Sequence, residues 1–132
     1  MLRVLVVDDQ ADVRTMISIV LRIQHFEIVE AESAASASAL FEGAHFDLAI
    51  VDMFLQGSSG AALISALRAR APGLPVVAIS GMAALDSLSE TPGLADVVGL
   101  QKPFRPADLM RAIQVARGAR RQPADAAVAA AM

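Results

Sequence analysis

The chain has 132 residues, a formal net charge of −3 and no cysteine. This length fits one domain with a single core, the missing cysteine excludes disulfides and thiolate chemistry, and the acidic balance with 4% aromatic residues argues against nucleic-acid binding. No apolar run reaches the roughly 18 residues of a membrane span, and the N-terminus lacks the form of a signal peptide, so a soluble cytoplasmic protein is expected.

Apolar runs of four to six residues alternate with stretches of helical period along the chain. In chain order, the patterns predict β(2–7), α(11–24), β(27–31), α(33–43), β(47–51), α(58–70), β(75–80), α(82–90), β(95–100) and α(105–118). Ser33 is expected to cap the second helix, and Ser58 or Ser59 the third. Pro106 fits the first turn of the last helix, where no backbone N–H is needed.

Four of the predicted strands end in, or just before, polar residues that suit one reaction: Asp8 and Asp9, Asp52, Ser80, and Lys102. Each of these alone is more typical of an ordinary solvated turn. Their conjunction carries the signal, because the carboxyl ends of parallel strands share one edge of a sheet and ligands bind at that edge. Carboxylates bind hard cations such as Mg²⁺, while Lys and Ser suit phosphoryl oxygens.

Strict alternation of strands and helices predicts an α/β fold with a parallel sheet, right-handed crossovers and helices on both faces. The carboxylates after strands one and three can meet only if those strands are neighbours. This favours the flavodoxin-like doubly wound (βα)5 fold with strand order 2-1-3-4-5. Residues 1–118 would form the domain, and the Ala- and Arg-rich residues 119–132 are expected to be a disordered tail or, alternatively, a linker.

The charges explain why these side chains would need a cation. Asp8, Asp9 and Asp52 contribute −3 and Lys102 contributes +1, which leaves −2 in a small cleft. Like charges about 4 Å apart near a protein surface repel by roughly 4 kcal/mol. A Mg²⁺ ion would bring the sum to zero, and a remaining Asp oxygen could then attack phosphorus to form an aspartyl phosphate.

These residues closely resemble the receiver domain of two-component response regulators, in particular its small stand-alone, chemotaxis-regulator-like type, over residues 2–118. The resemblance implies that Asp8, Asp9, Asp52 and the main-chain carbonyl of Phe54 bind Mg²⁺. It implies that Asp52 accepts the phosphoryl group and that Ser80 and Lys102 contact it. It also implies a cis peptide before Pro103 and a family-like loop from Asp52 to Gly60.

The resemblance further implies a phosphorylation switch rather than an enzyme with an external substrate, without an attached effector domain. The phosphodonor would be a histidine kinase or phosphotransfer protein. A downstream protein would bind the face formed by the fourth helix, fifth strand and fifth helix, and the chain would be a monomer or a homodimer through that face. Gly99 stands where the family usually has an aromatic ring, so we expect a smaller or differently located conformational change.

Two other functions fit parts of the sequence. A magnesium-dependent phosphatase with an aspartyl-phosphate intermediate is disfavoured, because the best-known design has Asp-x-Asp and this chain has Gln10 at the second Asp position. A phosphate-independent interaction module is favoured only by Gly99. The Arg cluster near the C-terminus, at 111, 117, 120 and 121, is typical of a solvated surface and gives little support for a nucleic-acid role.

Overall fold

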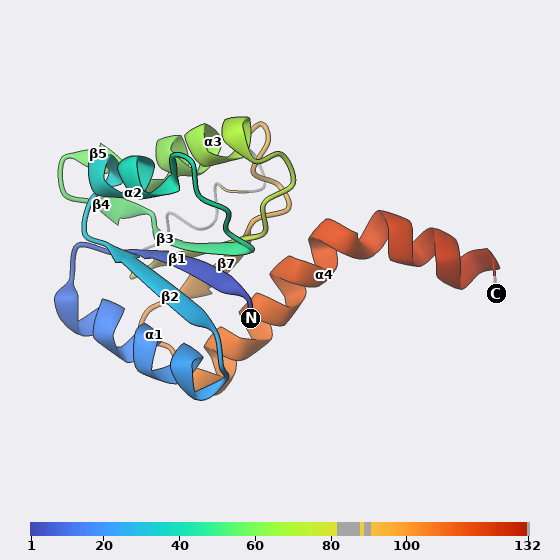
Figure 1. Cartoon of the computed structure of the whole chain (residues 1–132), viewed down its shortest axis with the longest axis horizontal. Coiled ribbons are helices and arrows are strands. Elements are labelled where there is room, and N and C mark those ends of the chain that lie inside the picture. The colour runs from blue at the N-terminus through green and yellow to red at the C-terminus, as the bar shows by residue number, and fades with distance from the viewer. Residues whose placement is uncertain (82–87, 89–90, 132) are drawn as a thin grey trace.

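A five-stranded parallel sheet lies between two layers of helices in the computed structural model (Figure 1). The structure describes residues 1–81, 88 and 91–131, with side chains up to residue 118. Helices α2 and α3 cover one face of the sheet, and α1 and α4 cover the other (Figure 1). The predicted doubly wound α/β fold is therefore confirmed.

The described elements follow the predicted alternation. They are β1 (Arg3–Val7), α1 (Ala11–Ile23), β2 (Glu27–Ala31), α2 (Ala34–Phe41), β3 (Leu48–Asp52), β4 (Phe54–Leu55), β5 (Ser58–Ser59), α3 (Gly60–Arg70), β6 (Val76–Ser80), β7 (Val98–Gln101) and α4 (Pro106–Ala131). The helix predicted at 82–90 falls mostly outside the described residues. Among those residues, no helix has the length and apolar content needed to cross a bilayer.

The sheet order β2-β1-β3-β6-β7 is the predicted order 2-1-3-4-5 in the numbering of the structure. Every residue of β3 and β6 is buried, as expected of strands covered on both faces. The register sets Val7 beside Val51 and Ser80 beside Gln101. The ends of β1, β3, β6 and β7 thus lie at one edge of the sheet.

Successive residues of each strand point into two separate cores. Leu5 and Val7 pack in the core under α2 and α3, whereas Val4 and Val6 pack in the core under α1 and α4. This is the period-two alternation of a strand with both faces buried. The central strands are packed on both faces by these two cores. The polar residues at the ends of the strands are therefore held in fixed positions.

Local sequence explains where the helices begin. The Ser33 hydroxyl accepts a hydrogen bond from the Ser36 N–H while the Ser36 hydroxyl accepts one from the Ser33 N–H, a complete capping box. The Ser59 hydroxyl caps α3 by accepting from the Ala62 N–H at 3.3 Å. The helix α4 begins at Pro106. All three predicted helix starts are confirmed to within a residue or two.

Several boundaries differ from the prediction; for example, β7 begins at Val98 instead of residue 95, and α2 ends at Phe41 instead of residue 43. Residues 58–59 belong to a short antiparallel ribbon with β4 instead of starting the third helix. The last helix was predicted to end at 118, which was wrong, since α4 remains helical to Ala131 and projects away from the sheet (Figure 1). Its extension is dominated by Ala, Arg and Gln, whose high helix propensity outweighs the cost of Pro123 within the helix. That residues 119–132 lie outside the folded domain stays a prediction.

Arg68 joins α3 to the segment that leads into β7. Its guanidinium pairs with both carboxylate oxygens of Asp96, at 2.6 and 2.9 Å, and also donates to the carbonyls of Leu74 and Gly93. Hydrogen bonds from Arg68 hold the pKa of the Asp96 carboxyl below its usual value. The stabilisation from this pair is therefore present above the unfolded pKa and is lost as pH falls through the folded pKa.

Arg68→Ala is expected to lower the free energy of unfolding by about 2 kcal/mol at neutral pH, because two carbonyls lose their charged donor. Urea unfolding followed by far-ultraviolet circular dichroism measures it, since the chain has no Trp or Tyr. Arg22→Ala, on the exposed part of α1, is the matched control. A loss no larger than that of the control, or one that does not shrink on acidification, would contradict this role of Arg68.

Candidate functional site: an acidic cluster at the sheet edge

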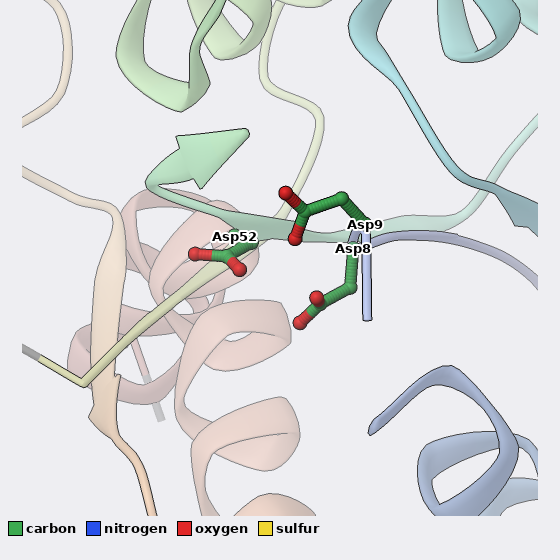
Figure 2. A group of neighbouring side chains, drawn as sticks. All are labelled: Asp8, Asp9 and Asp52. Carbon is green, nitrogen blue, oxygen red and sulfur yellow. The ribbon is translucent and has the colours of Figure 1, made fainter. Parts of the chain in front are cut away.

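Three aspartates meet where β1 and β3 end. Asp8 and Asp9 follow β1 directly, and Asp52 is the last residue of β3. Their carboxylates converge in Figure 2, and one oxygen from each lies within 4.8 Å of the others. Asp8 and Asp52 are buried and Asp9 is exposed, so the cluster opens to solvent on one side. This convergence agrees with the prediction, in which strands one and three are neighbours so that their carboxylates can meet.

Lys102 and Ser80 lie at the same edge. The backbone N–H of Lys102 donates to the Ser80 carbonyl at 2.8 Å, which ties the loop after β7 to the end of β6. The Lys102–Pro103 peptide is cis, as the family resemblance implied. The Lys102 ammonium lies 3.0 Å from Asp52 Oδ2 and 3.0 Å from Asp8 Oδ2. Ser80 is fully buried at the end of its strand.

Backbone amides fix the carboxylates from the other side. Asp52 Oδ1 accepts from the Phe54 N–H at 3.0 Å, and Asp8 Oδ1 accepts from the Gln10 N–H at 2.9 Å. Asp9 Oδ2 accepts from the Gln56 N–H at 3.1 Å, a bond that joins the loops after β1 and β3. One oxygen of each aspartate is thus oriented by the main chain, which leaves the other to face the cleft.

The cluster is electrostatically costly without a cation. Burial, together with the nearby Asp52 carboxylate, raises the pKa of Asp8, and neither the Gln10 amide nor Lys102 fully offsets this. Burial would lower the pKa of Lys102, but the neighbouring carboxylates of Asp8 and Asp52 outweigh burial and raise it. Lys102 therefore stays charged at neutral pH and compensates only part of the negative charge of the three aspartates.

The residues fit a Mg²⁺ ion. Asp8 Oδ2 is buried and accepts no hydrogen bond of suitable geometry among the described residues, although it lies 3.0 Å from the Lys102 ammonium. An under-satisfied carboxylate oxygen beside two further carboxylates is the hard-oxygen donor set that Mg²⁺ prefers. Phe54 lines the same cleft, a hollow of about 580 Å³ whose other lining residues are Asp9, Gln10, Asp52, Gly81 and Lys102. Its carbonyl as a metal ligand stays a prediction.

Two positions near the site went unrecognised in the sequence. Arg14 donates to the Asp8 carbonyl at 2.6 Å and pairs with Glu30 at 3.4 Å, which braces the turn that carries the aspartates. Gln10 accepts a hydrogen bond from Lys102. Neither residue belongs to an apolar run or a catalytic motif. Only the position of Arg14, in the first turn of α1 and shortly after the aspartates, could have indicated its role.

Gly99 lies in β7 beside Ala78 of β6. With no side chain there, a shallow hollow of about 280 Å³ remains between β7 and α4, and the half-exposed Val115 lies at its rim. This hollow lies on part of the face to which, according to the resemblance, a downstream protein would bind. How the face responds to phosphorylation stays a prediction.

The sheet order, the acidic cluster and the adjacent lysine define a class of protein. A sequence profile described as the response regulator receiver domain matches residues 4–114, which is most of the chain. The chain belongs to this family, the receiver domains of two-component response regulators. Receiver domains are signalling modules with a phosphorylation switch, and they generally bind Mg²⁺ at an acidic cluster of this kind.

Particular relatives agree with this assignment. The DNA-binding response regulator MtrA of Mycobacterium tuberculosis is 31% identical over 114 residues, which cover 85% of this chain and 49% of MtrA. The chemotaxis protein CheY4 of Vibrio cholerae superposes with a TM-score of 0.79 at 27% identity, covering 86% of this chain and 97% of that one. NtrX of Brucella abortus gives a TM-score of 0.83 at 28% identity, covering 96% of this chain and 29% of NtrX.

The chain spans between 22% and 49% of the length of the curated relatives it matches. CheY4, by contrast, is nearly covered from end to end. The similarity to the curated relatives thus covers less than half of each of those longer proteins.

Proposed function

We propose that this chain is a phosphorylation-dependent switch that takes a phosphoryl group on Asp52 from a histidine kinase or phosphotransfer protein. The observation that carries the proposal is the position of Asp52, which is buried at the end of β3 with Lys102 at 3.0 Å and two further carboxylates in reach. An Asp oxygen forms the new bond to phosphorus as the donor's bond to phosphorus breaks, and the donor keeps that electron pair.

The side chains of the site have different roles in this reaction. Asp8, Asp9 and Asp52, with the Phe54 carbonyl, would hold Mg²⁺, which would supply the positive charge that lets a phosphoryl group enter an acidic cleft. The Phe54 N–H orients the Asp52 carboxylate, and the Lys102 ammonium binds a phosphoryl oxygen. Ser80 contacts a second phosphoryl oxygen from the end of β6. Turnover on an external substrate is not needed, because the chain acts on its own aspartate.

Output follows from the charge added at Asp52. A phosphoryl group adds about −1 and new acceptor oxygens, which draw Ser80 and Lys102 inward with the loops after β6 and β7. The surface of β7 and α4 around Gly99 then changes its affinity for a protein partner or for a second copy of the chain. No aromatic ring stands at Gly99, so the change in structure is smaller than in a receiver that has one, or differently located.

Intact mass after incubation with acetyl phosphate tests the proposal. Wild type is expected to gain one phosphoryl group in the presence of Mg²⁺ and none in its absence, and Asp52→Ala is expected to gain none. Asp12→Ala, on the exposed first turn of α1, is the matched control and should behave as wild type.

Other outcomes would replace the proposal. No adduct, despite saturable binding of Mg²⁺, would support a phosphate-independent module. A stable adduct that persists in Asp52→Ala would exclude Asp52 as the acceptor. Sustained hydrolysis of a small phosphoester beyond one equivalent per chain, lost in Asp52→Ala, would favour a magnesium-dependent phosphatase instead.

A further inference from the structure

Gln10 takes the N-cap position of α1 without capping the helix. Its backbone is extended, with φ −93° and ψ 112°, but its side chain makes no capping hydrogen bond. Instead, its Oε1 accepts a hydrogen bond at 3.0 Å from the ammonium of Lys102, 92 residues away. A residue at this position usually satisfies a free N–H of the first turn. Here the side chain reaches across the cleft to the lysine of the proposed phosphoryl site.

The Lys102 ammonium is held by three oxygens in this state. Asp8 Oδ2, Asp52 Oδ2 and Gln10 Oε1 each lie 3.0 Å from it. Two of its three N–H donors are hydrogen-bonded, to Asp52 Oδ2 and Gln10 Oε1, while Asp8 Oδ2 is an ion-pair partner without suitable hydrogen-bond geometry. A phosphoryl oxygen that takes over a donor already in use has to displace Asp52 Oδ2 or Gln10 Oε1.

Gln10 is the contact that is released at least cost. Asp8 and Asp52 are charged and buried, and separating either from Lys102 would leave a carboxylate with less compensation in a low dielectric. Gln10 is exposed and neutral, so its amide oxygen exchanges Lys102 for water with little loss. Gln10 also lines the cleft beside Asp52, where the phosphoryl group would enter.

We propose that Gln10 is a positioning residue, which holds Lys102 on the carboxylates in the resting state and yields its place to a phosphoryl oxygen. This inference rests on the proposed phosphorylation of Asp52. Gln10 neither gives nor takes a proton, since the only covalent change is transfer of the phosphoryl group from its donor to an Asp52 oxygen. Its side chain thereby sets how readily Lys102 becomes available, and so the rate of phosphorylation.

Two substitutions separate this role from a merely structural one. Gln10→Ala frees one N–H of Lys102 and is expected to accelerate phosphorylation by acetyl phosphate on the order of threefold to tenfold, which corresponds to about 0.7–1.4 kcal/mol, the net strength of a typical hydrogen bond open to water. Gln10→Glu holds the ammonium more firmly and adds negative charge, so it is expected to slow the reaction. Damage to α1 would move both variants in the same direction.

Initial rates would be measured by intact mass at saturating Mg²⁺. The ¹⁵N signal of the Lys102 ammonium, without Mg²⁺ or phosphodonor, gives a readout independent of activity. Its hydrogens should exchange with water faster in Gln10→Ala than in wild type. Gln24→Ala and Gln24→Glu, at the exposed opposite end of α1, repeat both changes away from the cleft and should leave rate and exchange unchanged.

The outcomes are distinguishable. Phosphorylation of wild type with a Gln10→Ala rate within twofold of it, or with a slower Gln10→Ala, would overturn the role of Gln10 and leave the proposed function intact. Unchanged ammonium exchange in Gln10→Ala would also overturn it. No phosphorylation of wild type would overturn the proposed function, and this inference with it.

Discussion

Gly60→Ala is expected to lower the free energy of unfolding by about 3 kcal/mol, the upper part of the range for inserting a methyl group into a filled space. A Cβ at Gly60 would overlap the carbonyl oxygen of Asp52 and lie 2.6 Å from the Cα of Met53. These are main-chain atoms at the end of a central strand, so no flexible side chain can move aside. Urea unfolding followed by circular dichroism measures the loss.

The backbone at Gly60 cannot retreat without a further cost. Its N–H donates to the Met53 carbonyl at 3.0 Å, which closes the loop that carries Phe54 and Gln56 over the cleft. Relief of the overlap would therefore shift Asp52 or open this loop. The variant should also be phosphorylated more slowly, because the Phe54 N–H that orients the Asp52 carboxylate moves with the loop.

Gly118→Ala is the matched control. It makes the same chemical change in α4, at a position where a Cβ would have no neighbour within 4 Å. It should stabilise the chain by about 0.5–1 kcal/mol, the usual gain when Ala replaces Gly in a helix. If Gly60→Ala unfolds like this control, the close approach between Gly60 and Asp52 is not a structural constraint.

The sequence was sufficient for the sheet and for the position of the site because both depend on short-range patterns. Continuous apolar runs such as Leu48–Val51 identify buried strands, and the residue after each run must lie at the shared edge. The strand order was in turn favoured because it lets Asp8, Asp9 and Asp52 meet, and the structure has both the order and the cluster.

Long-range side-chain partners could not be predicted in this way. The bond between Gln10 and Lys102 depends on the rotamers of two long side chains from opposite ends of the chain. The ribbon of β4 with β5 involves two residues a side, too short to give a period. The extension of α4 was missed because a segment with little to bury was expected to be disordered, whereas its alanines favour a helix without tertiary packing.

The acidic cluster lowers the stability of the fold while it supplies the proposed metal ligands. The loss of stability can be measured at Asp8. Burial and the Asp52 carboxylate raise the pKa of Asp8, so the folded chain binds this proton more tightly than the unfolded chain does. Stability from this group is therefore greatest at low pH and falls as pH rises from the unfolded pKa to the folded pKa. At neutral pH the ionised Asp8 carboxylate destabilises the fold.

Asp8→Asn is expected to raise the free energy of unfolding at neutral pH, without Mg²⁺, on the order of 1–2 kcal/mol. This is less than the roughly 4 kcal/mol of two like charges 4 Å apart near a surface, since Lys102 already compensates part of the charge. The amide oxygen of the variant can still accept from the Gln10 N–H. Urea unfolding across a pH series measures the gain, which should shrink as pH falls below the unfolded pKa of Asp8.

Mg²⁺ should reverse the order of stability of wild type and Asp8→Asn. At 100 times its dissociation constant, a ligand that binds only the folded state adds about 2.7 kcal/mol, and wild type should gain this amount. Asp8→Asn lacks the under-satisfied carboxylate oxygen and should gain much less. Asp12→Asn, which removes the same charge from the exposed first turn of α1, should respond to Mg²⁺ as wild type does. An equal gain in Asp8→Asn would mean that Mg²⁺ binds without Asp8, and the destabilising carboxylate would then have no role in holding the ion.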